Sequence, residues 1–165
     1  MGVIVFLGLS AYAAYSDVAR YRIANWICLA ILADFVVLAA IAGAYGTLDP
    51  MSAVSGLGAG AVMLIAGFAL FAAGLFGGGD AKLLAASAVW FGWSGLFRFI
   101  ILVALMGGLL ALAVLGLRRV ASARAWNGPK WLIGLYAGDQ GIPYGVAIAA
   151  ASWLMIYPLV GRAGS

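Results

Sequence analysis

The sequence predicts an all-α membrane protein with about six transmembrane helices, in a single domain over residues 1–165. Two features of the composition predict this class: 67% of the 165 residues are hydrophobic, and only 8% are charged. So few charges cannot cover a soluble domain of this size with a hydrated surface, whereas lipid accepts apolar side chains on every face. The third observation is that several apolar runs approach the length of about 20 residues that crosses a hydrocarbon core.

Six apolar segments follow one another along the chain. In order, they cover roughly residues 2–16, 26–43, 53–76, 80–93, 95–117 and 142–160. The first segment lacks a basic region before it, so we expect a retained helix and not a cleaved signal. Asp49 and Pro50 mark a turn before the third segment. The fourth is short for a bilayer, so it either stops early or places Asp80 within the membrane thickness.

The basic residues predict how the segments are oriented. If the six segments alternate across the membrane, seven of the nine basic residues lie on one side. The other two, Arg98 and Arg162, lie on the opposite side. The seven are Arg20, Arg22, Lys82, Arg118, Arg119, Arg124 and Lys130. Because Lys and Arg are enriched in cytoplasmic loops, we expect the first side to be cytoplasmic and both termini to lie outside. The net charge of +4 then reports orientation and does not indicate nucleic-acid binding.

Several kinds of chemistry are excluded by the residues that the chain lacks. It has no histidine, no glutamate and a single cysteine, Cys28. A Ser–His–Asp triad, a histidine metal site and a CxxC pair therefore cannot be built. We expect neither a metal nor a cofactor.

Two aspartates, Asp17 and Asp80, are expected at the same face of the membrane. Asp80 follows Gly77–Gly79, and glycines let backbone or substrate approach closely. The simpler interpretation of this segment is a glycine turn with Asp80 capping the next helix. Asp17 closely precedes Arg20 and Arg22, so its simpler interpretation is a charge balanced by those arginines. The alternative for both is function, because acids in membranes are costly.

Taken together, the two aspartates favour a more specific hypothesis. Two carboxylates that share a site do not both ionise easily, so one holds a proton near neutral pH. This arrangement suits aspartyl proteolysis, in which the ionised carboxylate takes a proton from water and the protonated carboxyl donates to the peptide carbonyl. The sequence does not assign which aspartate begins protonated, because a coupled pair titrates jointly.

Three segments of the chain resemble motifs of the prepilin peptidases, a family of membrane aspartyl proteases. Gly77-Gly78-Gly79-Asp80-Ala81-Lys82 resembles the family's GxGDxK motif. Arg22-Ile23-Ala24-Asn25, which follows Asp17, is similar to its R-I-P-N motif, with Ala24 in place of the proline that would stiffen the next helix start. Ile142-Pro143-Tyr144-Gly145-Val146-Ala147 is similar to its P-Y-G-x-A motif. The three occur in the family's order and cover nearly the whole chain.

The resemblance implies an endopeptidase that cleaves the leader of type IV (Flp/Tad-type) prepilins. The catalytic pair would be Asp17 and Asp80, at the cytoplasmic face of the inner membrane. The small size resembles the CpaA/TadV branch of the family. Larger relatives carry a domain with paired CxxC motifs and also N-methylate the pilin; with one cysteine, this chain is expected to lack that activity. The expected partners are the prepilin and membrane lipid, and the oligomeric state stays open.

Six further residues are candidates for binding substrate or tuning the pair. They are Lys82, Gly77, Gly78, Gly79, Arg22 and Asn25. For Lys82 and Arg22 the alternative interpretation is orientation, with the side chains reaching toward lipid phosphates.

Two other classes of function remain open from the sequence. A small proton- or cation-coupled transporter would use Asp34, Asp17 and Asp80 as its path, although the chain lacks an obvious internal repeat. Asp34 falls near the middle of the second segment, where a protonated carboxyl could hydrogen-bond a neighbouring helix or bind substrate. In a purely structural subunit, the acids would only hold helices together.

Overall fold

The fold is known from a computed structural model, which describes residues 2–122 and 142–162. These residues form six α-helices and no strand. The helices are α1 (Gly2–Arg20), α2 (Asn25–Ala44), α3 (Pro50–Ala72), α4 (Gly78–Ala88), α5 (Gly92–Ser122) and α7 (Tyr144–Arg162). The predicted all-α class is confirmed.

Four of the helices are long and apolar enough to cross a membrane. These are α1, α2, α3 and α5, and α7 adds the shorter apolar stretch Tyr144–Tyr157. With 11 residues, α4 is much shorter. At a rise of about 1.5 Å per residue it covers only about half of a hydrocarbon core. The chain is therefore a multi-pass membrane protein in which one helix stops partway.

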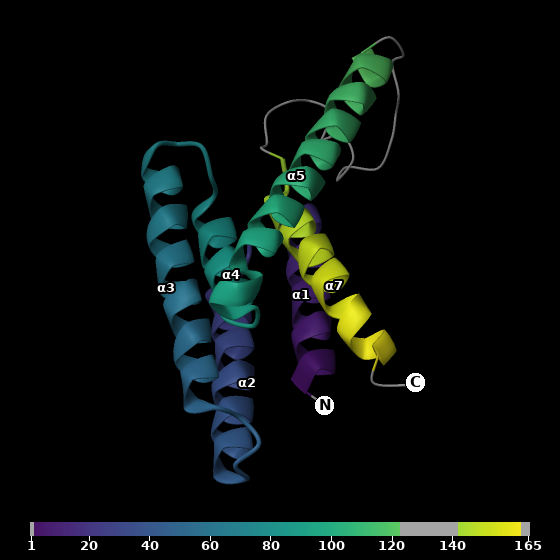
Figure 1. The fold of residues 1–165 in the computed structure, drawn as a ribbon. Helices are drawn as coiled ribbons and strands as arrows, with labels where there is room; N and C mark the ends of the chain where they lie inside the picture. The colour runs from purple at the N-terminus through teal and green to yellow at the C-terminus, as the bar shows by residue number, and fades with distance from the viewer. Residues whose placement is uncertain (1, 123–141, 163–165) are drawn as a thin grey trace.

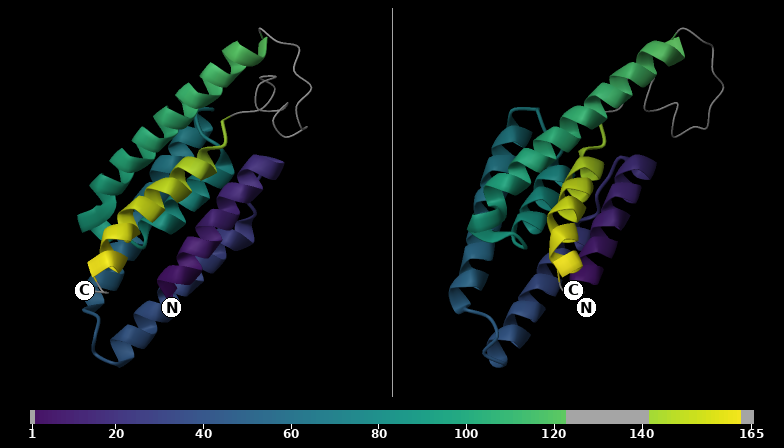
Figure 2. Two further views of the ribbon diagram at one scale, coloured as in Figure 1. Left: turned by 90° about the vertical axis from the view of Figure 1, so that its right-hand side faces the viewer. Right: turned by 45° about the vertical axis from the view of Figure 1, so that its right-hand side comes forward.

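The short helix α4 lies at the centre of the bundle (Figure 1). It packs against α2, α3 and α7, and seven of its residues are buried, Ala81 and the run from Leu83 to Ala88. Gly67 of α3 lets it approach closely, since a Cβ at this glycine would lie 2.9 Å from the Cβ of Ala81. Outside this centre, α1 and α7 lie side by side, and α5 crosses over α7 (Figure 2).

The helix ends divide between two ends of the bundle. The start of α1, the end of α7 and the connection between α2 and α3 lie at one end (Figure 1). The connection between α1 and α2, the connection between α3 and α4, and the last turns of α5 lie at the other (Figures 1 and 2). Asp17, in the last turn of α1, and Asp80, in the first turn of α4, therefore share one end, as predicted.

The fourth helix differs from its predicted range of residues 80–93. It begins earlier, at Gly78, and ends at Ala88. The Phe91 N–H donates to the Ala88 carbonyl at 3.1 Å, and Gly92 follows with a φ of +58°, a conformation that glycine adopts without strain. A tight turn thus replaces the last turn of the predicted helix and starts α5 inside the bundle.

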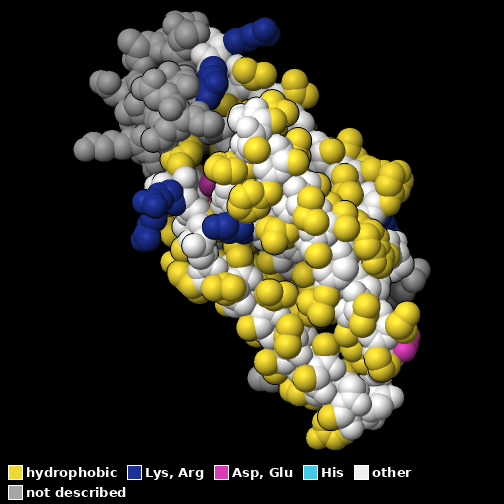
Figure 3. All heavy atoms as spheres, turned by 90° about the vertical axis from the view of Figure 1, so that its left-hand side faces the viewer, with side chains coloured by type: hydrophobic (Ala, Val, Ile, Leu, Met, Phe, Trp, Pro, Cys, Tyr) yellow, Lys and Arg dark blue, Asp and Glu magenta, His cyan; other side chains and the backbone are white. Residues whose placement is uncertain are grey.

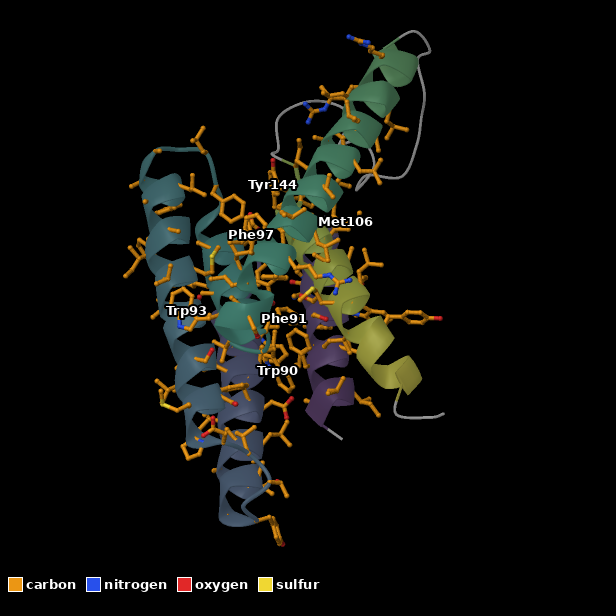
Figure 4. All side chains as sticks on the ribbon, in the orientation of Figure 1. Trp90, Phe91, Trp93, Phe97, Met106 and Tyr144 are labelled. Atoms are coloured by element: carbon orange, nitrogen blue, oxygen red, sulfur yellow. The ribbon has the colours of Figure 1, made fainter. Side chains whose placement is uncertain are left out.

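Aromatic side chains hold this turn in place. Trp90 stacks on Phe6 of α1 with ring centroids 4.7 Å apart, and Phe91 packs on Phe99 of α5 at the same separation. Figure 4 shows Trp90 and Phe91 between the start of α5 and α1, with Trp93 directed toward α3. The apolar run after Ala88 therefore reads like a helix in sequence, but in the structure the chain turns there and its rings pack against α1 and α5.

The outer face of the bundle is apolar. Large side chains such as Ile4, Ile65, Phe97 and Leu112 are mostly exposed. Figure 3 shows hydrophobic side chains over most of one face, with most of the visible lysine and arginine side chains gathered toward one end. This is the surface that lipid requires. Arg124 and Lys130, two of the basic residues that predict the orientation, lie outside the described residues.

Candidate functional site

Asp17 and Asp80 line the same cavity. It has a volume of 220 Å³, and its remaining wall is formed by Tyr21, Arg22, Ile23 and the three glycines 77–79. A second cavity of 300 Å³ shares Asp17, Tyr21, Gly77 and Asp80 and extends to Pro143 and Tyr144 at the start of α7. The two together are called the Asp17–Asp80 cavity below.

Asp17 is held by the start of α7. Its carboxyl is buried, and its Oδ2 accepts a hydrogen bond of 2.8 Å from the Gly145 N–H. Gly145 is the second residue of α7, where N–H groups have no partner within the helix and the helix dipole is positive. This contact stabilises the ionised form of Asp17. A Cβ at Gly145 would lie 2.7 Å from Oδ2, so no other residue fits without displacing the carboxylate.

The chain that follows Asp17 is fixed by two hydrogen bonds. The Tyr21 N–H donates to the Asp17 carbonyl, and the Ser16 hydroxyl donates to the Arg22 carbonyl, each at 2.8 Å. Ala24 then caps α2 with a φ of −71°. This angle lies within the range that proline imposes, so the backbone here has the conformation that the missing proline would give.

Asp80 is the third residue of α4, and the capping position belongs to Gly77. The backbone N–H groups of Gly77 and Gly145 both face the Asp80 carboxyl. A Cβ at Gly77 would lie 2.5 Å from Asp80 Oδ2, so a side chain there would displace the carboxyl. The other oxygen, Oδ1, is buried and has no hydrogen-bond partner. A helix cap therefore accounts for only part of the setting of Asp80, because Oδ1 lacks the hydrogen-bond partner that a buried carboxyl oxygen ordinarily has.

The two carboxyls act on each other electrostatically across the cavity. Two like charges that line one partly desolvated cavity disfavour double ionisation, which favours a single shared proton. A cavity with one ionised and one protonated carboxyl can supply a general base and a general acid together.

The other candidate residues divide between two places. Arg22 and the three glycines line the Asp17–Asp80 cavity. Lys82 and Asn25 do not line it; the Lys82 Nζ donates to Asn25 Oδ1 at 2.9 Å. These two belong to a separate apolar groove of 440 Å³ between α2, α3 and α4. The structure thus brings Lys82 and Asn25 together, but in this groove and not in the cavity that the aspartates line.

The remaining described acids lie elsewhere. Asp34 is near the middle of α2 and lines neither part of the Asp17–Asp80 cavity. Its Oδ2 is buried and has no hydrogen-bond partner. This oxygen therefore does not make the hydrogen bond to a neighbouring helix that the sequence suggested. Asp49 caps α3, with its Oδ1 accepting from the Met51 N–H at 3.2 Å. In the described part of the chain, no group of three His, Cys, Asp or Glu residues could hold a metal ion.

Two residues of the site were not singled out from the sequence. Gly145 was noted only as part of a motif, because nothing in a sequence says that its N–H meets a carboxylate on another helix. Tyr21 lies between Arg20 and Arg22, in a segment whose sequence is typical of a basic loop. The feature of the sequence that could have indicated a role is its position directly after the helix that carries Asp17.

Comparison with known proteins identifies one family. The model of the type IV leader peptidase family matches residues 4–112, a stretch that includes both Asp17 and Asp80. Searches of curated proteins and of solved structures gave no match.

Proposed function

Because the chain belongs to the type IV leader peptidase family, and is therefore a prepilin peptidase, we propose that Asp17 and Asp80 are its catalytic dyad. The substrates are prepilins. The finer proposal is that it removes the leader of Flp/Tad-type prepilins at the cytoplasmic face of the inner membrane. Its likeness to the CpaA/TadV branch and its single cysteine further support peptidase activity without N-methylation.

The observation that carries the proposal is the shared cavity. Asp17 and Asp80 come from different helices, α1 and α4, yet both carboxyls line a cavity of 220 Å³. The glycines 77–79 form part of its wall, where the absence of side chains lets an extended peptide approach the backbone. A pair of acids that served only to hold helices together would not need an open cavity between them.

The geometry supports a division of roles between the two acids. Asp17 Oδ2 accepts a hydrogen bond from the Gly145 N–H, whereas Asp80 Oδ1 has no hydrogen-bond partner, so we assign Asp17 as the base that takes a proton from the attacking water. Asp80 carries the shared proton and donates it to the carbonyl oxygen of the scissile peptide bond as the water oxygen bonds to the carbon. The addition of water gives a geminal diol at the former carbonyl carbon. Asp17 then gives the proton it took from water to the departing amine nitrogen, and the C–N bond breaks. Asp80 recovers its proton from a hydroxyl of the diol as the new carbonyl forms.

The charge distribution supports a cytoplasmic location of the cavity. Arg20 and Arg22 lie within five residues after Asp17, and Arg118, near the end of α5, acts electrostatically on Tyr21. Basic side chains are enriched at cytoplasmic ends of membrane helices. We assign Arg22 to substrate contact or orientation at the mouth of the cavity that it lines.

Cleavage of a prepilin tests the proposed function. Membranes that contain the wild-type chain should shorten a co-expressed Flp-type precursor by its leader, seen as one new amino terminus by mass spectrometry. A chelator should leave the rate unchanged, because no step uses a metal. Absence of any shortened product for every Flp-type precursor tried would contradict the Flp/Tad assignment.

The transporter alternative is tested by Asp34. A proton path across the membrane would need this carboxyl in the middle of α2, whereas leader cleavage at the Asp17–Asp80 cavity does not need it. We expect Asp34→Asn to cleave within about threefold of wild type, as for most changes away from reacting groups. Proton flux into vesicles that required Asp34, without precursor cleavage, would support the transporter instead.

Lys82 and Asn25 are proposed to position α4 relative to α2. Their hydrogen bond of 2.9 Å joins the helix that carries Asp80 to the start of α2. We expect Lys82→Met and Asn25→Ala each to slow cleavage by about 3- to 10-fold, and the double variant to be no slower than either, because the two groups act through one bond. Multiplying losses in the double variant would show separate roles.

A further inference from the structure

Tyr21 forms part of the wall of the Asp17–Asp80 cavity. It lines both parts of this cavity, together with both aspartates. The hydroxyl oxygen is buried and has no hydrogen-bond partner. Since a buried hydroxyl without a partner opposes folding, its presence calls for an explanation beyond packing.

The backbone holds Tyr21 in an unusual conformation. Its φ is +50°, and among the described residues it is the one non-glycine with a positive φ. This conformation costs conformational energy for a residue with a side chain, and such residues cluster at functional sites. Here the Tyr21 N–H bonds to the Asp17 carbonyl, so the same turn that ends α1 fixes the phenol relative to the carboxylate of Asp17.

A second residue of this cavity also has a buried polar atom without a partner. This is Oδ1 of Asp80, and the Tyr21 hydroxyl does not bond to it. The phenol of Tyr21 and the Asp80 carboxyl in its protonated form are two donors on residues of one cavity, and they match a ligand that brings an oxygen acceptor. A peptide carbonyl supplies such an acceptor.

The phenol remains a donor under working conditions. Burial raises the pKa of Tyr21 above its ordinary value, the negative charge of Asp17 raises it further, and the positive charge of Arg118 opposes these effects. A tyrosine in this setting keeps its proton at neutral pH. It therefore offers a neutral O–H and does not compete with Asp17 as a base.

These observations extend the proposed peptidase function, on which they rest, to a third group. We propose that the Tyr21 hydroxyl is a catalytic group that donates a hydrogen bond to the carbonyl oxygen of the scissile peptide bond, beside the protonated carboxyl of Asp80. As water adds, the C=O double bond becomes a single bond and the oxygen takes the proton of Asp80. The proton of Tyr21 stays on Tyr21 throughout, and its hydrogen bond strengthens as negative charge grows on the oxygen.

Tyr21→Phe tests this proposal with the loss of one oxygen atom. Precursor cleavage is measured in detergent or vesicles for the wild type, Tyr21→Phe, Asp17→Asn and Tyr15→Phe. Tyr15 is the matched control, because it lies on the helix that leads into Tyr21 and its side chain is 65% exposed. We expect kcat of Tyr21→Phe to fall about 10- to 100-fold with KM within about threefold, as for loss of a donor used in the transition state. Tyr15→Phe should match the wild type.

The outcomes separate this proposal from the peptidase function itself. An unchanged kcat for Tyr21→Phe, or a raised KM alone, would overturn the role of Tyr21 while cleavage by the wild type and its loss in Asp17→Asn still support the dyad. Wild-type cleavage that survives Asp17→Asn would instead overturn the dyad. A peptide with a hydroxyl in place of the scissile carbonyl should also bind Tyr21→Phe more weakly, whereas a lower melting temperature with equal binding would indicate a structural role only.

Discussion

Asp17→Asn and Asp80→Asn, made singly, are each expected to slow leader removal by about 10³- to 10⁴-fold, the range seen when a group in acid–base catalysis is lost. Asparagine keeps the shape of the carboxyl but neither accepts the proton of water nor donates one to the carbonyl. The amide that replaces Asp17 would still meet the start of α7, and the amide that replaces Asp80 would still fit beside Gly77. The loss should therefore fall on kcat, measured as the rate of precursor shortening at saturating substrate.

Asp49→Asn is the matched control for these two variants. It makes the same chemical change at the opposite end of the bundle, where Asp49 caps α3. Asparagine caps helices as well as aspartate does, so the fold and the rate should be preserved. Equal amounts of protein in the membrane must accompany the comparison. Loss of cleavage in Asp49→Asn at wild-type protein levels would show that the assay reports acid content in general and not the cavity.

Gly145→Ala is expected to produce the second-largest effect, a loss of about 10²-fold in kcat, as for a displacement of about 1 Å at a catalytic group. The new Cβ would lie 2.7 Å from Asp17 Oδ2 and 2.9 Å from Ile23 Cδ1. Either the carboxylate moves away from the Gly145 N–H or the start of α7 moves away from α1. Both responses weaken the contact that holds the Asp17 carboxyl in place.

Gly108→Ala is the control for this change. It also adds one methyl group to a helix, but nothing lies within 4 Å of a Cβ at Gly108. Alanine favours a helix over glycine in both variants, so helix propensity does not explain a difference between them. Kinetics and thermal unfolding of the two variants are compared in the same detergent. Similar rates for Gly145→Ala and Gly108→Ala would mean that the contact between α7 and Asp17 is not needed for cleavage.

The sequence predicted the features that depend on local composition. Long apolar runs required a bilayer, and the distribution of basic residues put Asp17 and Asp80 at one end. Composition and periodicity could not predict the convergence of the two carboxyls on one cavity, because it depends on how α1, α4 and α7 pack; the family resemblance alone implied it. The same holds for Gly145, whose role is a contact between residues far apart in the chain.

Two predictions differ from the structure for physical reasons: the length of the fourth helix and the place of Lys82. The predicted fourth helix was too long, because hydropathy does not distinguish a helix from the partly buried aromatic turn at Trp90 and Phe91. Lys82 stood within the glycine motif, which favoured a place beside the aspartates. Two residues along a helix correspond to a rotation of about 200°, so its side chain leaves α4 on nearly the opposite face from Asp80. Helical geometry could have indicated this in advance.

The central claim is that Asp17 and Asp80 act as one catalytic unit in one cavity. The most direct test is the rate of precursor cleavage by the Asp17→Asn/Asp80→Asn double variant, followed over long incubations beside both single variants. When two groups act as a unit, removing either one already removes the catalytic effect of both. The double variant should therefore cleave within about threefold of the slower single variant. Losses that multiply in the double variant, or normal cleavage by either single variant, would contradict the account.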